Sequence, residues 1–463
     1  MNQIKPNSLA ARDIAYYLHP YTNAVRHEAE GPLVLTEGKG IYVYDENGRA
    51  YIEGLAGLWS VSLGFGEQRL IDAAAAQMKK LPYYHSFTHK APAVTIELAE
   101  KLIQMAPVPM SKVFFANSGS EANDSVVKMV WYYSNALGRP KKKKIISRQK
   151  AYHGVTVASA SLTGLPNNHR DFDLPIANIL HTDCPHYYRF AQEGESEEQF
   201  SRRLADNLEK LILAEGPDTV AAFIAEPVMG AGGVIVPPAG YFDRIQAVLK
   251  KYDILFVADE VICGFGRTGN MFACQTYNLK PDIMCVAKAL SSSYLPISAV
   301  LINEKVYAAL RDNSAKIGTF GHGFTYSGHP VSAAVALETL KIYEERDIVS
   351  QVRRVMPTFQ RELRRFTDHP LVGEVRGVGL VGAVELVKNK RTGEPFEPQQ
   401  MVGFNAAKFC QDHGLITRAI MDSIAFCPPL IITEAEIEEM FRRFARGLDS
   451  TWAWVREQGL AAA

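Results

Sequence analysis

The fold follows from three apolar runs: ILFVA at residues 254–258, IMCV at 283–286 and SAVLI at 298–302. None of these runs alternates apolar with polar residues, and this pattern is typical of strands that are buried on both faces of a sheet. Segments with helical periodicity lie between such runs, for example at 94–105 and 122–130. Strands that alternate with helices predict an α/β fold with a mostly parallel central sheet and helices on both faces.

The two ends of the chain differ from its middle. Residues 33–53 alternate apolar and polar positions around Asn47-Gly48, which predicts a hairpin. After about residue 330, long helical segments surround a β-rich stretch, and no linker separates the parts. We therefore expect an N-terminal segment (1–58) that contributes to a small domain, a large domain (59–329) and a small C-terminal α/β domain (330–463).

Composition and charge exclude several classes of partner. The chain of 463 residues has 50 Lys and Arg against 50 Asp and Glu, and its one basic run, Lys141–Lys144, is interpreted as a solvated approach to a strand. No stretch has the roughly 18 apolar residues of a membrane span, and the N-terminus lacks the apolar region of a secretory signal. The six cysteines form no C-x-x-C pair. We expect a cytoplasmic protein with no nucleic-acid or membrane partner.

Metal-ligating residue types come closest together at His181, Cys184 and His186. This grouping lacks a clear fourth ligand and contains Pro185, so a surface loop is the better interpretation. We therefore expect no metal site.

Polar residues follow the predicted strands, at the edge where open α/β sheets bind ligands. Asp259 comes directly after 254–258, and a buried carboxylate there needs a partner such as a protonated pyridine nitrogen or a structural cation. Lys288 follows 283–286 among small residues, where burial would lower its pKa and leave an amine able to attack an aldehyde. NSGSE at 117–121 offers backbone N–H groups to a phosphate, or is a plain helix N-cap.

Two glycine-rich stretches complete the set of motifs. HGFTYSGHP at 322–330 is typical of a tight loop near a ligand or a second subunit, or of an ordinary loop between domains. GFGRTG at 264–269 fits the G-x-G-x-x-G of dinucleotide sites. However, five residues separate it from the preceding strand, no clear amphipathic helix follows, and Asp282 comes too early to bind a ribose. A nicotinamide dehydrogenase is therefore disfavoured.

Taken together, the motifs resemble those of the class III (ω-type) aminotransferases, which are pyridoxal-phosphate (PLP) enzymes of fold type I. The matching stretches are NSGSEAND (117–124), YHG (152–154), AEPV (225–228), ADEVICGFGRTG (258–269), AKALSSSY (287–294) and HGFTYSGHP (322–330). They occur in one order, and the resemblance runs from about residue 15 to the end. It implies that the large domain binds PLP, and that two subunits share active sites in a homodimer or a tetramer.

The resemblance also implies a role for each residue around the cofactor ring. Lys288 would form a Schiff base with PLP and then transfer the proton between substrate and cofactor. Asp259 would pair with the pyridine nitrogen and maintain the ring as an electron sink. Tyr152 would stack on one ring face and Val261 would contact the other. Glu226 would lie nearby, or make a purely structural hydrogen bond.

The phosphate and the substrate have their own implied residues. Gly119 and Ser120 would hold the phosphate, and Thr325 would reach it from the second subunit. Arg418 matches the mobile arginine of the amine–pyruvate subgroup, whose guanidinium can bind a carboxylate through two hydrogen bonds and swing aside for an uncharged group. The aromatic pocket of that subgroup is matched by Trp59, Phe87 and Tyr152, although aromatic side chains are also ordinary core residues.

From this resemblance we expect a PLP-dependent aminotransferase. It would transfer an amino group from an amine or ω-amino acid to pyruvate or a similar keto acid by a ping-pong mechanism. A taurine–pyruvate or polyamine–pyruvate aminotransferase, and a PLP-dependent mutase or decarboxylase of the same family, stay open as alternatives. Two positions depart from the family pattern, because Ser293 replaces a frequent glycine and Glu53 replaces the usual aspartate. Neither departure removes a catalytic group.

Overall fold

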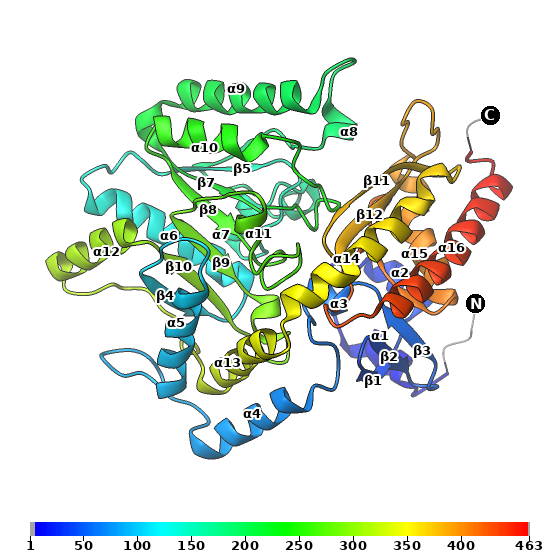
Figure 1. The fold of residues 1–463 in the computed structure, drawn as a ribbon, viewed down its shortest axis with the longest axis horizontal. Helices are drawn as coiled ribbons and strands as arrows, with labels where there is room; N and C mark the ends of the chain where they lie inside the picture. Colours follow the sequence, from blue (N-terminus) through cyan, green and yellow to red (C-terminus); the bar gives the residue numbers. More distant parts are fainter. Residues whose placement is uncertain (1–4, 462–463) are drawn as a thin grey trace.

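A seven-stranded sheet forms the centre of the larger part of the molecule in this computed structural model, which describes residues 5–461 (Figure 1). The strands lie in the order β4-β10-β9-β8-β7-β5-β6. β10 runs antiparallel to its neighbours β9 and β4, and the remaining pairs are parallel. Their bounds are β4 Lys112–Ala116, β5 Lys144–Arg148, β6 Ile179–Thr182, β7 Val220–Ala225, β8 Leu255–Asp259, β9 Ile283–Val286 and β10 Ser298–Ile302.

The three apolar runs of the sequence form β8, β9 and β10, which are neighbours in this sheet. Every residue of these three strands is buried, as expected for strands without polar alternation. The prediction of an α/β fold with a mostly parallel central sheet, consistent with PLP fold type I, is therefore confirmed.

Helices cover both faces of the sheet because successive side chains of a strand point to opposite sides. Ile224 and Val257 pack in one core cluster with residues of α6 and α12. Phe223 and Phe256, one position earlier on the same strands, pack in another cluster with residues of α5, α9, α10 and α13. The bounds are α5 Ala93–Met105, α6 Gly119–Ala136, α9 Glu197–Glu215, α10 Tyr241–Lys251, α12 Glu304–Ile317 and α13 Pro330–Glu345.

A small sheet joins the two ends of the chain. The predicted hairpin forms β2 (Tyr42–Asp45) and β3 (Ala50–Glu53), β1 (Leu35–Lys39) pairs with β2, and β13 (Leu415–Ile416) adds in parallel to β3. This pairing agrees with an N-terminal segment that contributes to the C-terminal part. The domain boundaries at 58/59 and 329/330 stay predictions.

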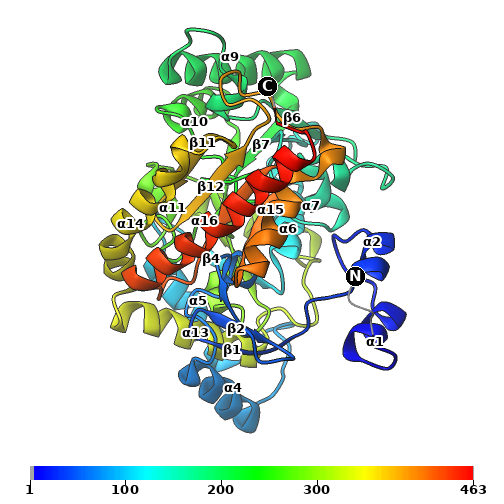
Figure 2. The ribbon, with the colours of Figure 1, turned by 90° about the vertical axis from the view of Figure 1, so that its right-hand side faces the viewer.

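Another small sheet is antiparallel, in the order β11-β12-β15-β14, and Figure 2 labels its strands β11 and β12. Its strands are β11 Val372–Val378, β12 Val381–Leu386, β14 Arg418–Ile420 and β15 Ser423–Phe426, and the helices of this part are α14 Ile348–Arg364, α15 Val402–Asp412 and α16 Glu434–Glu457. α16 begins with the predicted capping box, in which Thr433 and Glu436 each accept the other's backbone N–H.

Shorter elements connect these layers. They are α1 Leu9–Tyr16, α2 Ala24–Glu30, α3 Ala56–Trp59, α4 Gln68–Lys80, α7 Val157–Leu162, α8 Tyr187–Phe190 and α11 Ala273–Thr276, with 3₁₀ turns at η1 Pro166–Asn168, η2 Pro217–Thr219, η3 Lys288–Ser291, η4 Arg365–Asp368 and η5 Pro398–Gln400. Among residues 5–461, no helix combines the length and the apolar character that a membrane crossing needs.

The interpretation of Lys141–Lys144 as a solvated run holds for Lys141, which is exposed, and is wrong for Lys142, which is buried. Lys142 is 7% exposed, and its Nζ donates to the carbonyl of Tyr252. Lys143 and Lys144 also donate to carbonyl oxygens of neighbouring elements. The ammonium groups are bound to the protein because their long apolar stems pack against it while each head finds an acceptor.

Candidate active site

Asp259 is the last residue of β8, and one oxygen of its buried carboxylate accepts two side-chain hydrogen bonds. Its Oδ2 accepts hydrogen bonds from His153 Nδ1 at 2.7 Å and from Asn123 Nδ2 at 2.8 Å. Its Oδ1 accepts one bond, from the backbone N–H of Val261 at 3.1 Å. Oδ1 therefore keeps room for a further donor, and the carboxylate is 3% exposed. The arrangement fixes an acceptor at the carboxyl end of a central strand, where the fold binds ligands.

Lys288 lies at the same edge of the sheet, at the end of the neighbouring strand. β9 runs parallel to β8, with Cys285 opposite Asp259, and Lys288 begins η3 with a φ of +49°. Burial lowers the pKa of the Lys288 amine, against the opposite effect of the charges of Asp259 and Glu226. Its Nζ makes no hydrogen bond or ion pair with any residue in the range 5–461. A free amine at this position is chemically able to add to a carbonyl.

The N-terminus of α6 faces the segment after β8. Ser118 is the N-cap, and its Oγ accepts the N–H of Glu121 at 3.1 Å, so the plain capping role belongs to this residue. The next two residues, Gly119 and Ser120, have N–H groups without an intrahelical partner, as at every helix start. A Cβ added at Gly119 would lie 3.3 Å from Cγ1 of Val261. The two N–H groups at this helix start are of the kind that binds an anion such as phosphate.

Glu226 fixes the backbone next to Tyr152. Its two oxygens accept the N–H groups of Tyr152 and Gly230, each at 3.0 Å, and burial raises the pKa of this carboxyl. The structural hydrogen bond that the sequence left open for Glu226 is thus observed. Burial and a hydrogen bond with Tyr21 raise the pKa of the Tyr152 hydroxyl. Glu226 therefore holds the backbone of Tyr152 in place, and its expected position near the cofactor ring stays a prediction.

The expected substrate residues separate into two groups. Trp59 is 2% exposed and packs in a core cluster that includes Val228 and Ile262. Arg418 is the first residue of β14, and burial lowers the pKa of its guanidinium. Arg418 forms no ion pair with any described residue. An unpaired, half-buried guanidinium is costly, and this favours a role in binding a carboxylate.

Phe87 and Thr325 lie elsewhere. A Cβ added at Gly323 would meet Phe87 at 2.8 Å, and Tyr83 donates to the carbonyl of Thr325 at 2.8 Å. Both Phe87 and Thr325 are exposed, and within residues 5–461 neither bonds to the groups around Asp259. The expectation that Thr325 acts from a second subunit is compatible with this placement and stays a prediction.

Three residues of the site were not predicted from the sequence. His153 and Asn123 lie in the quoted motifs YHG and NSGSEAND, yet neither was assigned a role. The sequence pointed to them only indirectly, because a buried carboxylate at Asp259 requires N–H donors from other residues. Tyr21, whose hydroxyl accepts a hydrogen bond from Asn168 and lies beside Tyr152, carries no sequence signal.

The two departures from the family pattern have visible consequences. Ser293 has a φ of +58°, in the left-handed region that glycine adopts without strain. Glu53 accepts the N–H groups of Leu55 and Gly57 at the entrance to α3, and burial raises its pKa to about 7.

Comparisons with known proteins place these features in a family. A protein-family model described as "Aminotransferase class-III" matches residues 24–448. The chloroplastic γ-aminobutyrate transaminase 3 of Solanum lycopersicum is 54% identical over 97% of this chain and 88% of its own length. The vanillin aminotransferase of Capsicum frutescens is 52% identical over 95% of this chain and 96% of its own. An ω-transaminase from Pseudomonas jessenii, solved in complex with PMP, is 60% identical, with a TM-score of 0.96 over 97% of this chain and 99% of that one.

Proposed function

Because the chain belongs to the class III aminotransferases, which use pyridoxal phosphate, we propose that it transfers an amino group from an amine or ω-amino acid to pyruvate or a similar keto acid. The two half-reactions would follow a ping-pong order. The observation that carries the proposal is the pair of adjacent strand ends. One holds Asp259 with its donors and the other holds Lys288 with its unpaired amine.

The residues present fit this cofactor. The N–H groups of Gly119 and Ser120 would hold its phosphate, and Oδ1 of Asp259 would accept the pyridinium N–H. His153 supports this assignment because its Nδ1 donates to Oδ2 of Asp259, while Oδ1 accepts only the backbone N–H of Val261 and keeps room for a further donor. When bound, the cofactor supplies a carbonyl for the amino group and a ring that withdraws electrons from the reacting carbon.

The protein contributes an acceptor for the proton of the substrate. Burial lowers the pKa of Lys288, so a larger fraction of its Nζ is unprotonated at neutral pH and can take the proton from the carbon that bears the amino group. Tyr152 is fixed by Glu226 through its backbone, which keeps its ring at the same edge of the sheet.

Arg418 is proposed to select between substrate types. Its guanidinium would bind the carboxylate of a keto acid or amino acid, and would swing aside for an amine that lacks one. The names of relatives at 52% to 54% identity span an ω-amino acid, γ-aminobutyrate, and an aromatic aldehyde, vanillin. This range supports a pocket that accepts both kinds of partner.

The protein is proposed to act as a homodimer. A homodimer would bring Thr325 and Phe87 of one subunit toward the site of the other, which accounts for their exposure in a single chain. The cytoplasmic location stays a prediction, since the named relatives include chloroplastic and mitochondrial enzymes.

The test of the reaction is a half-reaction experiment with Lys288→Ala. In the wild type, the visible absorption band should move on addition of amine and return on addition of pyruvate. Lys288→Ala should lose this cycle, and Lys316→Ala, an exposed lysine on α12, serves as the matched control. An unaltered cycle in Lys288→Ala would contradict the assignment. Isomerisation without an acceptor, or release of carbon dioxide, would instead indicate the mutase or the decarboxylase.

The test of substrate choice uses Arg418→Ala with a panel of donors: γ-aminobutyrate, β-alanine, taurine, a polyamine and an arylalkylamine. A charged hydrogen bond contributes about 1.5–3 kcal/mol, so kcat/KM for carboxylate substrates should fall by about tenfold or more. The half-reaction of the arylalkylamine should be spared. Equal losses for both kinds of donor would refute selection by Arg418.

A further inference from the structure

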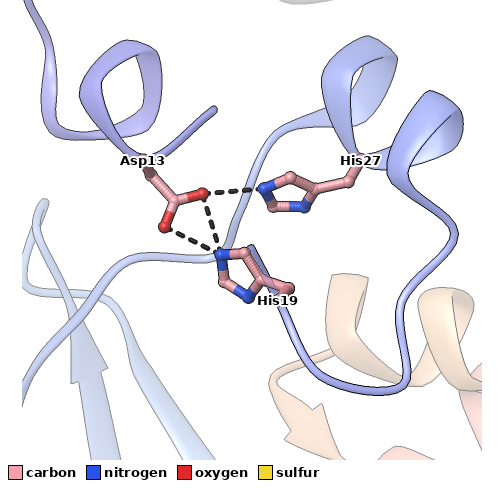
Figure 3. A group of neighbouring side chains, drawn as sticks. All are labelled: Asp13, His19 and His27. Carbon is pink, nitrogen blue, oxygen red and sulfur yellow. Dashed lines mark hydrogen bonds and ion pairs between the residues drawn. The ribbon is translucent and has the colours of Figure 1, made fainter. Parts of the chain in front are cut away.

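A cluster of metal-ligating side chains lies near the N-terminus, outside the candidate active site. Asp13 lies on α1, His19 in the loop that follows and His27 on α2, and their polar ends converge (Figure 3). Nε2 of His19 lies 2.8 Å and 3.0 Å from the two oxygens of Asp13, and Nε2 of His27 lies 2.7 Å from Oδ2. One ligand atom from each residue lies within 4.8 Å of the others. We name these three residues the N-terminal cluster.

The donor set suits a transition metal better than an alkaline-earth ion. Two imidazole nitrogens and one carboxylate oxygen form a common set of zinc ligands, whereas Ca²⁺ and Mg²⁺ prefer oxygen alone. The carboxylate of Asp13 lies between the two rings and provides the oxygen ligand of this set.

Both histidines can present a lone pair to an ion. Each ring directs Nε2 at Asp13, and Nδ1 of neither ring has a hydrogen-bond partner within residues 5–461. The single ring proton can therefore move to Nδ1 and leave Nε2 unprotonated, as metal ligation requires.

Space beside the cluster allows water to complete a coordination sphere. A surface cavity of about 420 Å³ borders Asp13 and His19, and another of about 300 Å³ borders His19 and His27. The three side chains are between 13% and 25% exposed. The cluster is thus shielded enough to hold its geometry and open enough for an ion to enter.

A second group of metal-ligating side chains consists of His186, Glu374 and Glu385, and arginine side chains already neutralise its carboxylates. Arg376 donates to both carboxylates at 2.5 Å, and Arg189 donates to Glu385. In the part of the chain that the structure describes, no lysine or arginine forms an ion pair with Asp13. The N-terminal cluster therefore lacks the fixed cations that the other group has.

We propose that the N-terminal cluster binds one divalent transition-metal ion of the zinc type through Asp13, His19 and His27, with water in the open position. Metal–ligand bonds of about 2.0–2.2 Å in a tetrahedron place neighbouring ligand atoms about 3.3–3.6 Å apart. Each Nε2 must therefore move away from its nearest carboxylate oxygen by about 0.5–0.9 Å, which side-chain rotation provides. The ion would replace the hydrogen bonds and join α1 to α2.

The loop between the two histidines contacts the candidate active site. Tyr21 lies between His19 and His27 in the sequence, its hydroxyl accepts a hydrogen bond from Asn168 at 2.5 Å, and burial together with Tyr21 raises the pKa of the neighbouring Tyr152 hydroxyl. Figure 2 shows α1 and α2 at the margin of the molecule. The ion would therefore fix a peripheral segment that reaches the edge of the site.

The test is a zinc titration of the holoenzyme after removal of metals with a chelator, in competition with a chromophoric indicator. All six cysteines are buried, so thiols do not compete. The wild type should bind one Zn²⁺ per chain, and His27→Gln should bind at least about 100-fold more weakly, since even an outer-shell change costs 10- to 100-fold. Glutamine keeps a hydrogen-bond donor for Asp13, so the metal-free variant should retain the melting temperature of the wild type.

His369→Gln is the matched control, because His369 lies 3.7 Å from Asp449 without a second histidine. It should bind zinc like the wild type. Co²⁺ should give visible d–d absorption in the wild type and in this control, at longer wavelength than the cofactor band, and none in His19→Gln or His27→Gln. Absence of stoichiometric binding in the wild type, or equal affinity in the doubly substituted His19→Gln/His27→Gln protein, would overturn the proposal.

Discussion

Replacing Glu53 with glutamine removes a carboxyl that the fold buries at the end of β3. Glu53 is 5% exposed, and its oxygens accept the N–H groups of Leu55 at 2.9 Å and Gly57 at 2.8 Å. Burial raises its pKa from 4.5 to about 7, against the lowering effect of these two hydrogen bonds. The difference between these two pKa values corresponds to about 3 kcal/mol, since one pKa unit is worth about 1.36 kcal/mol.

The folded protein holds the proton of Glu53 more tightly than the unfolded protein does. Because the pKa of Glu53 is higher in the folded than in the unfolded protein, its contribution to stability is fully present below pH 4.5 and is lost as the pH rises to about 7. Glutamine does not ionise. Its amide nitrogen cannot accept the N–H that one Glu53 oxygen accepts, so Glu53→Gln should be less stable than the wild type in acid. Relative to the wild type, its free energy of unfolding should then rise by up to about 3 kcal/mol between about pH 4 and about pH 8.

Thermal unfolding at a fixed protein concentration measures this effect. An unfolding entropy of about 2.1 cal/mol/K per residue gives about 1 kcal/mol/K for a chain of this length, so the melting temperature of the variant should gain about 3 °C on that of the wild type between about pH 4 and about pH 8. Glu97→Gln, on the exposed face of α5, is the control and should change nothing. If the variant and the wild type differed by the same amount at about pH 5 and about pH 8, the reasoning from burial would be refuted.

Three further substitutions have defined outcomes. Ser293→Gly should raise the free energy of unfolding by about 1 kcal/mol in denaturant titrations, because the φ of +58° costs serine but not glycine; a loss of stability would contradict this. His153→Phe removes a charged hydrogen bond to Asp259 and should weaken PLP binding by about 10- to 100-fold in equilibrium dialysis; unchanged affinity would show that Asp259 needs no support. Gly119→Ala should cost about 1–3 kcal/mol of cofactor binding, since its Cβ would press on Val261 at 3.3 Å; retention of full affinity would exclude this contact.

Local patterns predicted the fold and the two central site residues. Unbroken apolar runs give strands buried on both faces, and a polar residue directly after such a run must lie at the edge of the sheet. Asp259 and Lys288 satisfy both conditions, and the parallel pairing of β8 and β9 brings them to one edge. The role of each residue came from the family resemblance.

Contacts between distant segments were not predictable in this way. Asn123 and His153 approach Asp259 from 136 and 106 residues away, and no periodicity encodes such a pairing. Lys142 was assigned to solvent because a charge run has no local sign of burial, yet an acceptor on another element binds it. Phe87 was expected in the pocket, and a single chain leaves it exposed.

The parallel pairing of β3 with β13 also constrains how the chain folds during synthesis. Ile52 lies opposite Leu415, so β3 must wait for about 360 further residues before its partner leaves the ribosome. At about 5–20 residues per second, this delay is about 20–70 s. Throughout that time the nascent hairpin has an unpaired strand edge, which another chain can join. Translation speed and chaperone supply, rather than the strength of the finished contacts, are then expected to set the yield of active protein in a recombinant host.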